Sequence, residues 1–110
     1  MSLPVKVIQL SGILSHTQAK QFRQEIADLI EAGTVEVLID FEQVTFMDSA
    51  GLGVLVSILK LVNGADGTVS LCSIRQEVKM LLDLADVAQF FEIFPNQEAF
   101  YQAKANYSPI

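Results

Sequence analysis

A serine beside an aspartate, followed closely by two glycines, is the part of this sequence best suited to chemistry. Residues 48–53 read Asp-Ser-Ala-Gly-Leu-Gly, and Asp48 and Ser49 are residue types that cap helix N-termini. Gly51 and Gly53 leave the first turn of a following helix bare, so another protein's backbone could approach the Ser49 hydroxyl closely. A phosphate on Ser49 would be stabilised at the positive end of the helix and would add about −1.5 to −2 charges beside Asp48. These residues indicate a docking switch, although the same types also serve as plain helix caps.

The sequence offers little for catalysis. A Ser49 nucleophile would need a general base, and the chain has a single histidine, His16. Asp-Ser-Ala-Gly is not the Gly-x-Ser-x-Gly nucleophile motif, and neither a P-loop nor a Gly-x-Gly-x-x-Gly motif is present. The carboxylates of Asp40, Glu42 and Asp48 lack the spacing of a metal-binding loop. We therefore expect a protein that is not an enzyme and needs no metal or cofactor, with a small hydrolase using Ser49 and His16 as the alternative.

Composition and charge predict a small soluble domain with an apolar-rich core. Its 110 residues, 51% of them hydrophobic, predict one domain over 1–110 with a single core. A formal net charge of −6 argues against binding to nucleic acid or to anionic lipid. One cysteine, Cys72, excludes an intramolecular disulfide and is expected to be an inert core thiol. Because no signal peptide and no apolar run of about 18 residues is found, we expect a cytoplasmic protein without a membrane partner.

Alternating strand and helix patterns position the motif. The almost continuous apolar run at 35–41 is typical of a strand buried on both faces of a parallel sheet, and 42–47 is expected to be a short connector into the motif. The pattern predicts an α/β domain with a mixed, mostly parallel sheet of about four strands and about four helices. Strands are predicted at 5–10, 35–41, 68–72 and 90–94, and helices at 17–31, 49–63, 73–84 and after Asn96, the last one carrying Tyr107.

Several helix starts and one strand end carry predictions of their own. Ser15 with Gln18, and Ser73 with Gln76, have the spacing of capping boxes. Asp40 follows three apolar residues and is expected to end its strand on the solvent side.

The helix after the motif is apolar around more of its circumference than a surface helix needs. Its apolar residues cover roughly 220°, against a stripe of about 100° for an ordinary surface helix. A helix buried on all sides would explain this as well, but 110 residues rarely bury one completely. Because the mean hydropathy of +0.40 is also high, we expect part of this helix to contact a partner. The apolar residues are Leu52, Val54, Leu55, Val56, Ile58, Leu59, Leu61 and Val62.

The stretch 37–53 resembles the signature of STAS domains, specifically the stand-alone bacterial anti-sigma-factor antagonists. In that family an apolar strand and a short connector precede Asp-Ser-Ser/Thr/Ala-Gly-Leu-Gly at the start of a helix, and the similarity extends over roughly 5–100. The resemblance implies a protein–protein switch in bacterial transcription. Ser49 would be phosphorylated by a partner that is both a serine protein kinase and an anti-sigma factor. The unmodified form would bind this kinase, the phosphorylated form would release it, and a phosphatase would reset the switch.

The same resemblance implies a set of partner-binding residues. ATP and Mg²⁺ would belong to the kinase, so this chain would need no cofactor. Ala50 stands where the family often has Ser or Thr, which leaves Ser49 as the only acceptor in the motif. Ser15 stands where an aspartate of the family helps to meet the kinase. The implied partner-binding residues are Asp48, Ser49, Ala50, Gly51, Leu52 and Gly53, together with Ser15 and His16.

Two further expectations follow from the resemblance. Family members usually have a strand before the one at Val5, and this chain begins too late for it. The sheet edge freed in this way could pair with a second copy, giving a homodimer. The alternative function within the family is a STAS-like structural subunit of a larger assembly, such as a lipid-transport ATPase complex, in which Ser49 is not modified.

Overall fold

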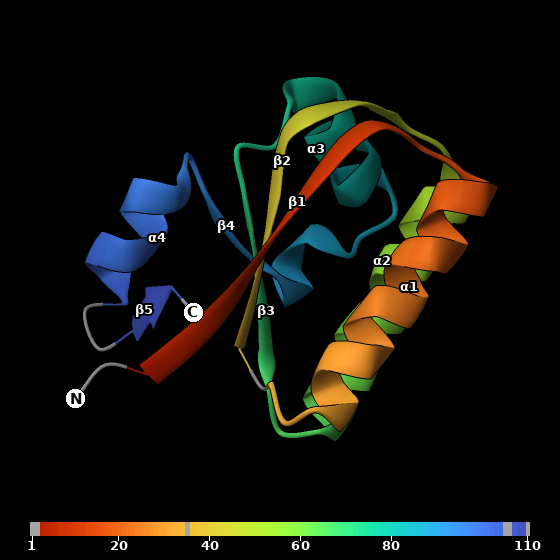
Figure 1. Cartoon of the computed structure of the whole chain (residues 1–110). Helices are drawn as coiled ribbons and strands as arrows, with labels where there is room; N and C mark the ends of the chain where they lie inside the picture. Colours follow the sequence, from red (N-terminus) through yellow and green to blue (C-terminus); the bar gives the residue numbers. More distant parts are fainter. Residues whose placement is uncertain (1–2, 35, 105–106, 110) are drawn as a thin grey trace.

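Strands and helices alternate along the chain (Figure 1). The computed structural model describes residues 3–34, 36–104 and 107–109, with the backbone alone at 3, 4, 16 and 107–109. All four predicted helices are present. The elements in order are β1 (Leu3–Leu14), α1 (His16–Glu31), β2 (Glu36–Met47), α2 (Ser49–Gly64), β3 (Thr68–Cys72), α3 (Gln76–Leu84), the 3₁₀ helix η1 (Ala88–Phe90), β4 (Glu92–Phe94), α4 (Gln97–Ala103) and β5 (Tyr107–Pro109).

One parallel sheet organises these elements. Its strand order is β4-β3-β2-β1-β5, and every adjacent pair is parallel. Ile8, Ile39, Leu71 and Ile93 are register partners from β1 to β4 and form one apolar row across the sheet. The predicted α/β class with four core strands is confirmed, and the three-residue β5 is an addition to it.

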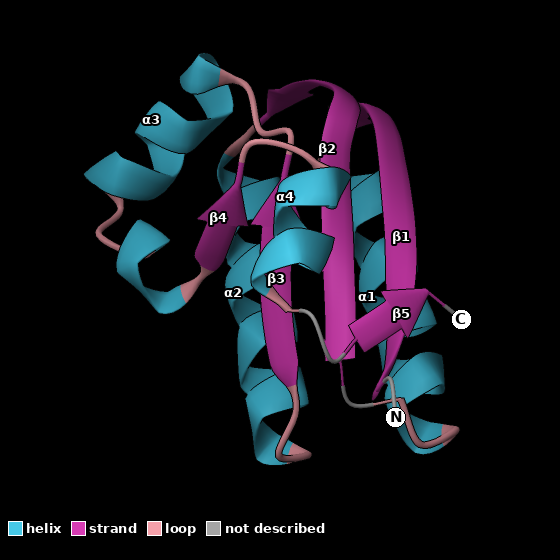
Figure 2. Cartoon of the chain, turned by 90° about the vertical axis from the view of Figure 1, so that its left-hand side faces the viewer, coloured by secondary structure: helices cyan, strands magenta, loops and turns pink. Residues whose placement is uncertain are grey.

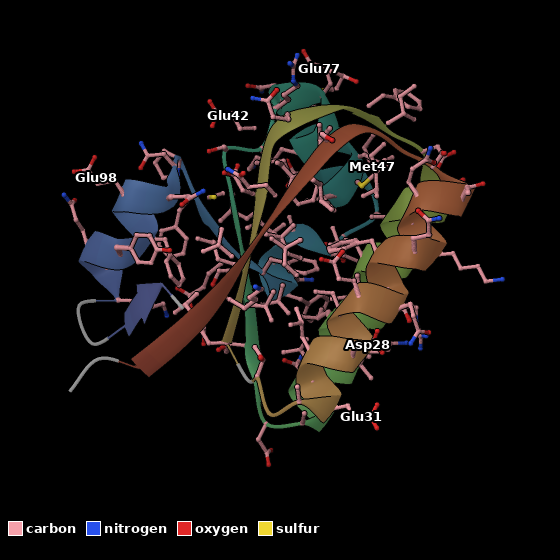
Figure 3. The ribbon with its side chains drawn as sticks, viewed as in Figure 1. Asp28, Glu31, Glu42, Met47, Glu77 and Glu98 are labelled. Carbon is pink, nitrogen blue, oxygen red and sulfur yellow. The ribbon has the colours of Figure 1, made fainter. Side chains whose placement is uncertain are left out.

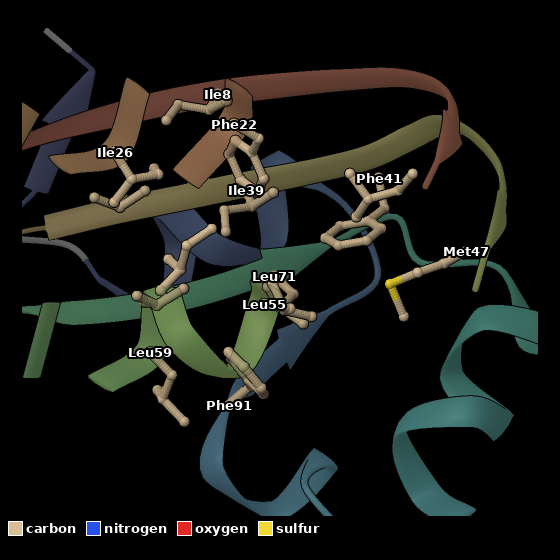
Figure 4. Packing of buried hydrophobic residues seen from close by; sticks show 14 of the residues in the cluster. Ile8, Phe22, Ile26, Ile39, Phe41, Met47, Leu55, Leu59, Leu71 and Phe91 are labelled. Carbon is tan, nitrogen blue, oxygen red and sulfur yellow. The ribbon is translucent and has the colours of Figure 1, made fainter. Parts of the chain in front are cut away.

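Helices cover both faces of the sheet. Figure 2 shows α4 in front of the strands and α1 and α2 behind them. Alternate residues of β2 serve the two faces, because successive side chains of a strand point in opposite directions. Val37, Ile39 and Phe41 belong to the large core shared with α1, α2 and α3, of which Figure 4 labels Ile39 and Phe41. Leu38 instead packs with Phe100 of α4 in a smaller cluster. Burial of β2 on both faces, expected from its apolar run, is confirmed.

The second strand is longer than predicted. Residues 42–47, expected to be a connector, continue β2 and pair with residues 11–14 of β1. Register shifts between Gln9 and Ser11 and between Gly12 and Ile13 break the two-residue alternation of side chains. Because the alternation is broken, the sequence of this extension does not show the pattern of a strand. It also carries both strands over the end of the core toward the start of α2 (Figure 1).

Two of the predicted helix starts are wrong in detail. Ser15 is the N-cap of α1, but its hydroxyl donates to the Gln18 side chain at 2.5 Å instead of accepting from a backbone amide. Ser73 does not cap α3, because its φ of 58° lies in the left-handed region and α3 begins after Arg75. Asn96 caps α4 as predicted, with its side-chain oxygen accepting from the Ala99 amide at 2.8 Å.

Asp40 is buried, not solvent-facing as expected. It lies inside β2 with 2% of its surface exposed, on the sheet face covered by α4. Its carboxylate accepts from the Gln97 side chain of α4 at 2.7 Å, from the Gln9 side chain at 3.3 Å and from the Glu42 amide at 2.9 Å. These donors explain how a carboxylate can lie in the sheet, since buried polar groups require hydrogen-bond partners.

The C-terminal strand occupies part of the sheet edge that was expected to be free. Leu3–Val5 of β1 pair with β5, so Tyr107 belongs to a strand and the final helix ends at Ala103. Over the ranges that the structure describes, no strand pairs with the outer edge of β1 beyond Val5. Homodimer formation through this edge stays a prediction. None of the described helices has the length and apolar character needed to cross a membrane.

Candidate functional site

The strand–helix junction at Asp48 forms the candidate site. Asp48 is the N-cap of α2, and its Oδ1 accepts from the Gly51 amide at 2.9 Å. Its carbonyl accepts from the Leu52 amide at 3.0 Å, which is the first hydrogen bond of the helix. The helix-cap role predicted for Asp48 is therefore confirmed. Ser49 is then the first helical residue, and its side chain is exposed.

The position of Ser49 suits a negatively charged modification. The amides of Ser49 and Ala50 precede the first hydrogen bond of α2, so they lack an intrahelical acceptor. The helix that Ser49 begins has sixteen residues, and their aligned peptide dipoles place partial positive charge at this end. A phosphate on the Ser49 oxygen would therefore meet favourable electrostatics from the helix and would project into solvent.

The two glycines of the motif face different surroundings. Gly51 is buried, and a Cβ placed there would lie 2.3 Å from the carbonyl oxygen of Leu14 and 2.8 Å from Cγ of Met47. Gly53 is exposed, and nothing lies within 4 Å of the corresponding position. Gly51 thus allows α2 to approach the end of β1, whereas Gly53 keeps the outer surface bare. The expectation that both glycines leave the outer surface bare is confirmed for Gly53 and wrong for Gly51.

The structure brings the early and central parts of the predicted site together. Leu14 and Met47 are register partners at the ends of β1 and β2, so the next residues, Ser15 and Asp48, begin α1 and α2 at the same edge of the sheet. Ser15 is half-buried. The roles predicted for His16, in partner binding and in the hydrolase alternative, concern a side chain outside the described residues. Of the other predicted residues, Ala50 and Leu52 are half-buried.

An apolar groove next to Ser49 was missed by sequence reasoning. We call it the Ser49 groove; its volume is about 350 Å³, and it lies between the end of β2 and α3. Figure 3 labels Met47 and Glu77, one from each of these elements. Its lining residues are Thr45, Phe46, Met47, Asp48 and Ser49 on one side and Glu77, Val78 and Leu81 on the other.

Exposed apolar side chains extend this surface. Phe46 is 55% exposed, and Ile13, its register partner on β1, is 52% exposed. The sequence held one sign of this surface, a phenylalanine two residues before the N-cap aspartate, but this residue lay in the segment expected to be a connector. The apolar surface that adjoins Ser49 therefore comes from β2 and α3 as well as from α2.

The predicted partner face of α2 is smaller than its composition suggested. Leu55, Ile58, Leu59 and Val62 are buried in the core. The remaining apolar residues of the helix are only partly covered: Leu52, Val54, Val56 and Leu61.

The single cysteine lies away from the groove, on the α4 side of the sheet. Cys72 is fully buried, and its burial, reinforced by the charge of Asp40, raises the pKa of the thiol to about 11. The thiol is therefore protonated near neutral pH and a poor nucleophile, in agreement with the inert role predicted for it. Within the described part of the chain, no three His, Cys, Asp or Glu residues are grouped so that they could hold a metal ion.

Comparison with known proteins identifies the family. The sequence matches the STAS domain family over residues 2–99, and the chain therefore belongs to the STAS family. It is 30% identical over 94 residues to the anti-sigma F factor antagonist of Paenibacillus polymyxa, covering 84% of this chain and 80% of that protein. The resemblance to anti-sigma-factor antagonists seen in the sequence is thereby confirmed.

Solved structures agree with the fold. The protein TM1081 of Thermotoga maritima superposes with a TM-score of 0.81 at 24% identity, covering 90% of this chain and 87% of that one. The anti-sigma factor antagonist SpoIIAA in its unphosphorylated form gives a TM-score of 0.68 at 26% identity, covering 88% and 86%. Bacillus SpoIIAA in its phosphorylated form gives 0.69 at 21% identity, covering 88% of both chains.

Proposed function

We propose that this chain is an anti-sigma-factor antagonist in which phosphorylation of Ser49 controls binding to an anti-sigma factor that is also a serine kinase. The observation that carries the proposal is the exposed Ser49 at the first position of α2, directly after the Asp48 cap. The similarity to an anti-sigma F factor antagonist supports the role. The existence of SpoIIAA structures in unphosphorylated and phosphorylated forms supports a phosphorylation switch in such a protein.

The local geometry explains how one phosphate could change binding and leave the fold intact. Hydrogen bonds to the Asp48 carboxylate and carbonyl already hold the first turn of α2. A phosphate on the neighbouring exposed hydroxyl breaks neither bond, and the helix dipole favours its charge. What changes is the outer surface, which gains about −1.5 to −2 charges beside the carboxylate of Asp48. The unmodified surface would bind the kinase, and the charged surface would release it until a phosphatase removes the phosphate.

Intact-mass spectrometry tests the proposal directly. The protein is incubated with ATP, Mg²⁺ and each purified anti-sigma kinase encoded in its own genome. We expect a gain of one phosphate in the wild type and none in Ser49→Ala. Ser57→Ala is the matched control, because Ser57 lies two turns along the same helix, where its hydroxyl accepts from Arg23 at 2.7 Å; this variant should gain the phosphate normally. A stable complex with no phosphate in any combination would favour the unmodified structural-subunit alternative and overturn the switch.

Release is the second half of the proposal. The dissociation constant of the kinase is measured for the unmodified and the fully phosphorylated protein, each purified and verified by mass. We expect binding to weaken at least tenfold on phosphorylation, and treatment with a serine phosphatase to restore it. Equal affinity of the two forms would contradict a switch even if Ser49 is a genuine acceptor.

A further inference from the structure

We propose that the Ser49 groove is the anchoring site for an apolar side chain of the partner kinase, with a basic residue beside it that pairs with Glu77. This inference rests on the proposed function and adds to it the part of the surface that recognises the kinase. The groove was found from the structure alone, and α3, which forms one of its walls, is not part of the sequence motif.

The lining of the groove defines the chemistry of its occupant. Phe46, Met47, Val78 and Leu81 supply apolar walls from both sides. A volume of about 350 Å³ exceeds what a large side chain needs, and the half-exposed Phe46 can pack over whatever enters. A buried apolar side chain in a central pocket is a typical anchor of protein interfaces.

Charge decides the type of residue beside this anchor. The ionisable residues that line the groove are Asp48 and Glu77, and both are acidic. Asp48 already accepts from the Gly51 amide, whereas Glu77 is an exposed residue of the first turn of α3. The chain as a whole carries a net charge of −6. A partner residue that enters beside Glu77 is therefore favoured if it is Lys or Arg.

Anchoring at this point would couple binding to the state of Ser49. Ser49 is itself a lining residue of the groove, so a kinase anchored there holds its active site close to the acceptor hydroxyl, which favours phosphate transfer by proximity. Once formed, the phosphate stands at the groove wall as a strongly hydrated dianion. An apolar side chain could then enter only by stripping water from that charge, which is unfavourable. The same groove would serve recognition before phosphorylation and release after it.

Two groove variants with one matched control test this inference, with the cognate kinase as the probe. Phe46→Gln and Leu81→Gln remove apolar wall from either side, and we expect each to weaken binding of unmodified protein and to lower kcat/KM for phosphorylation at least tenfold. Leu84→Gln is the control, because Leu84 lies on the same helix, is 82% exposed and does not line the groove. It should leave both quantities within twofold of wild type. Thermal melting identifies any variant that loses its fold. If Leu81→Gln unfolds, Phe46→Gln still tests the inference, because the half-exposed Phe46 side chain can be replaced without opening the core.

The charge component has its own comparison. Glu77→Lys should weaken kinase binding about tenfold, whereas Glu98→Lys, an equal charge change on α4 across the sheet (Figure 3), should change it less than twofold. Wild-type affinity and kcat/KM in Phe46→Gln, Leu81→Gln and Glu77→Lys, with Ser49 still phosphorylated, would overturn the groove inference and leave the proposed function standing. A wild-type protein that neither binds nor accepts phosphate from any such kinase would overturn both.

Discussion

At the scale of single residues, the motif separates structural from surface roles. Gly51 and Gly53 are two positions apart, yet one faces a backbone carbonyl and the other faces solvent. Asp48 holds the helix start, while Ser49 beside it is exposed. The sequence predicted that these residues act together at a helix start. It could not distinguish the inward glycine from the outward one, because that distinction depends on β1, more than thirty positions earlier in the chain.

Alanine substitutions at the two glycines should have opposite effects on stability. Gly51→Ala forces a methyl group against the Leu14 carbonyl, and we expect the free energy of unfolding to fall by about 1–3 kcal/mol. Gly53→Ala fills open space on an exposed helix and should raise it by about 0.5–1 kcal/mol. Urea denaturation of both variants beside wild type measures this. Equal effects would show that α2 does not approach β1 as described.

A phosphate-mimicking change at Ser49 should separate binding from folding. Ser49→Asp adds one negative charge in the first turn of α2, where the helix dipole favours it. We expect the melting temperature to stay within about 2 °C of wild type, since exposed substitutions usually change stability by no more than about 0.5 kcal/mol. Binding of the proposed partner kinase should weaken, because the added charge would face the proposed interface. Calorimetric melting and titration calorimetry give the two values, and a collapse of the melting temperature would mean that Ser49 is part of the folded core.

The buried thiol predicts an alkaline limit to stability. The pKa of Cys72 is raised from 9.0 to about 11, first by burial and then by Asp40. The unfolded chain therefore releases this proton at lower pH than the folded chain, so the contribution to stability is full below pH 9 and is lost as the pH rises through about 11. We expect the free energy of unfolding to fall more steeply over this range in wild type than in Cys72→Ala. Parallel slopes in urea titrations at pH 8, 9.5 and 11 would contradict the burial of the thiol.

At the scale of elements, the sequence predicted the presence of the four helices and the four core strands, but not two of the helix starts, and not the pairings between distant segments. The helix containing the motif and the apolar half of β2 follow from periodicity, which depends on nearby residues alone. The extension of β2 over 42–47 was not predicted because its bulges disturb the alternation of apolar and polar residues along the strand. The strand β5 was not predicted because three residues are too few to show such an alternation. The Ser49 groove needed both the β2 extension and the packing of α3 beside it, so its existence could not be derived from the motif.

The attachment of α4 should depend on its first residue more than on its exposed face. Gln97 donates to the buried carboxylate of Asp40 at 2.7 Å. Gln97→Ala removes that donor, and we expect a loss of about 1–3 kcal/mol from the free energy of unfolding. Gln102→Ala is the matched control, because the exposed Gln102 side chain donates to the exposed Glu98 at 3.3 Å, and its loss should change stability by less than about 0.5 kcal/mol. Chemical denaturation distinguishes the two; equal losses would argue against an anchoring role for Asp40.

At the scale of the whole molecule, the sheet separates two surfaces. The edge of the sheet where α1 and α2 begin carries the motif. On one face of the sheet, Phe100 of α4 packs with Leu38 of β2 in a separate small core. The net charge of −6 affects the rate at which a charged partner associates with either surface. An acidic protein that binds a partner with a basic contact surface associates faster than a neutral one, and salt screens this effect.

Association with the kinase should therefore slow as salt is added. We expect the association rate constant of the unmodified protein to fall at least fivefold between about 0.05 and 0.5 M NaCl, because the Debye length shrinks from above 10 Å to a few ångströms over that range. The dissociation rate constant should change much less, because it would depend on the short-range contacts proposed for the Ser49 groove. Stopped-flow or surface-based kinetics measures both, and an association rate that is independent of salt would exclude electrostatic steering.

The contact beneath Gly51 has a genetic consequence. The atom nearest to its missing side chain is the main-chain oxygen of Leu14, which every amino acid at position 14 would also supply. A neighbour's side chain can shrink over generations to accommodate a larger residue, but a peptide carbonyl cannot. A lineage that loses this glycine therefore has no compensating change available at position 14, and reversion to glycine is its direct route back. Exposed residues of the motif, such as Gly53, are free of this constraint, whereas Gly51 is constrained by the backbone of β1 itself.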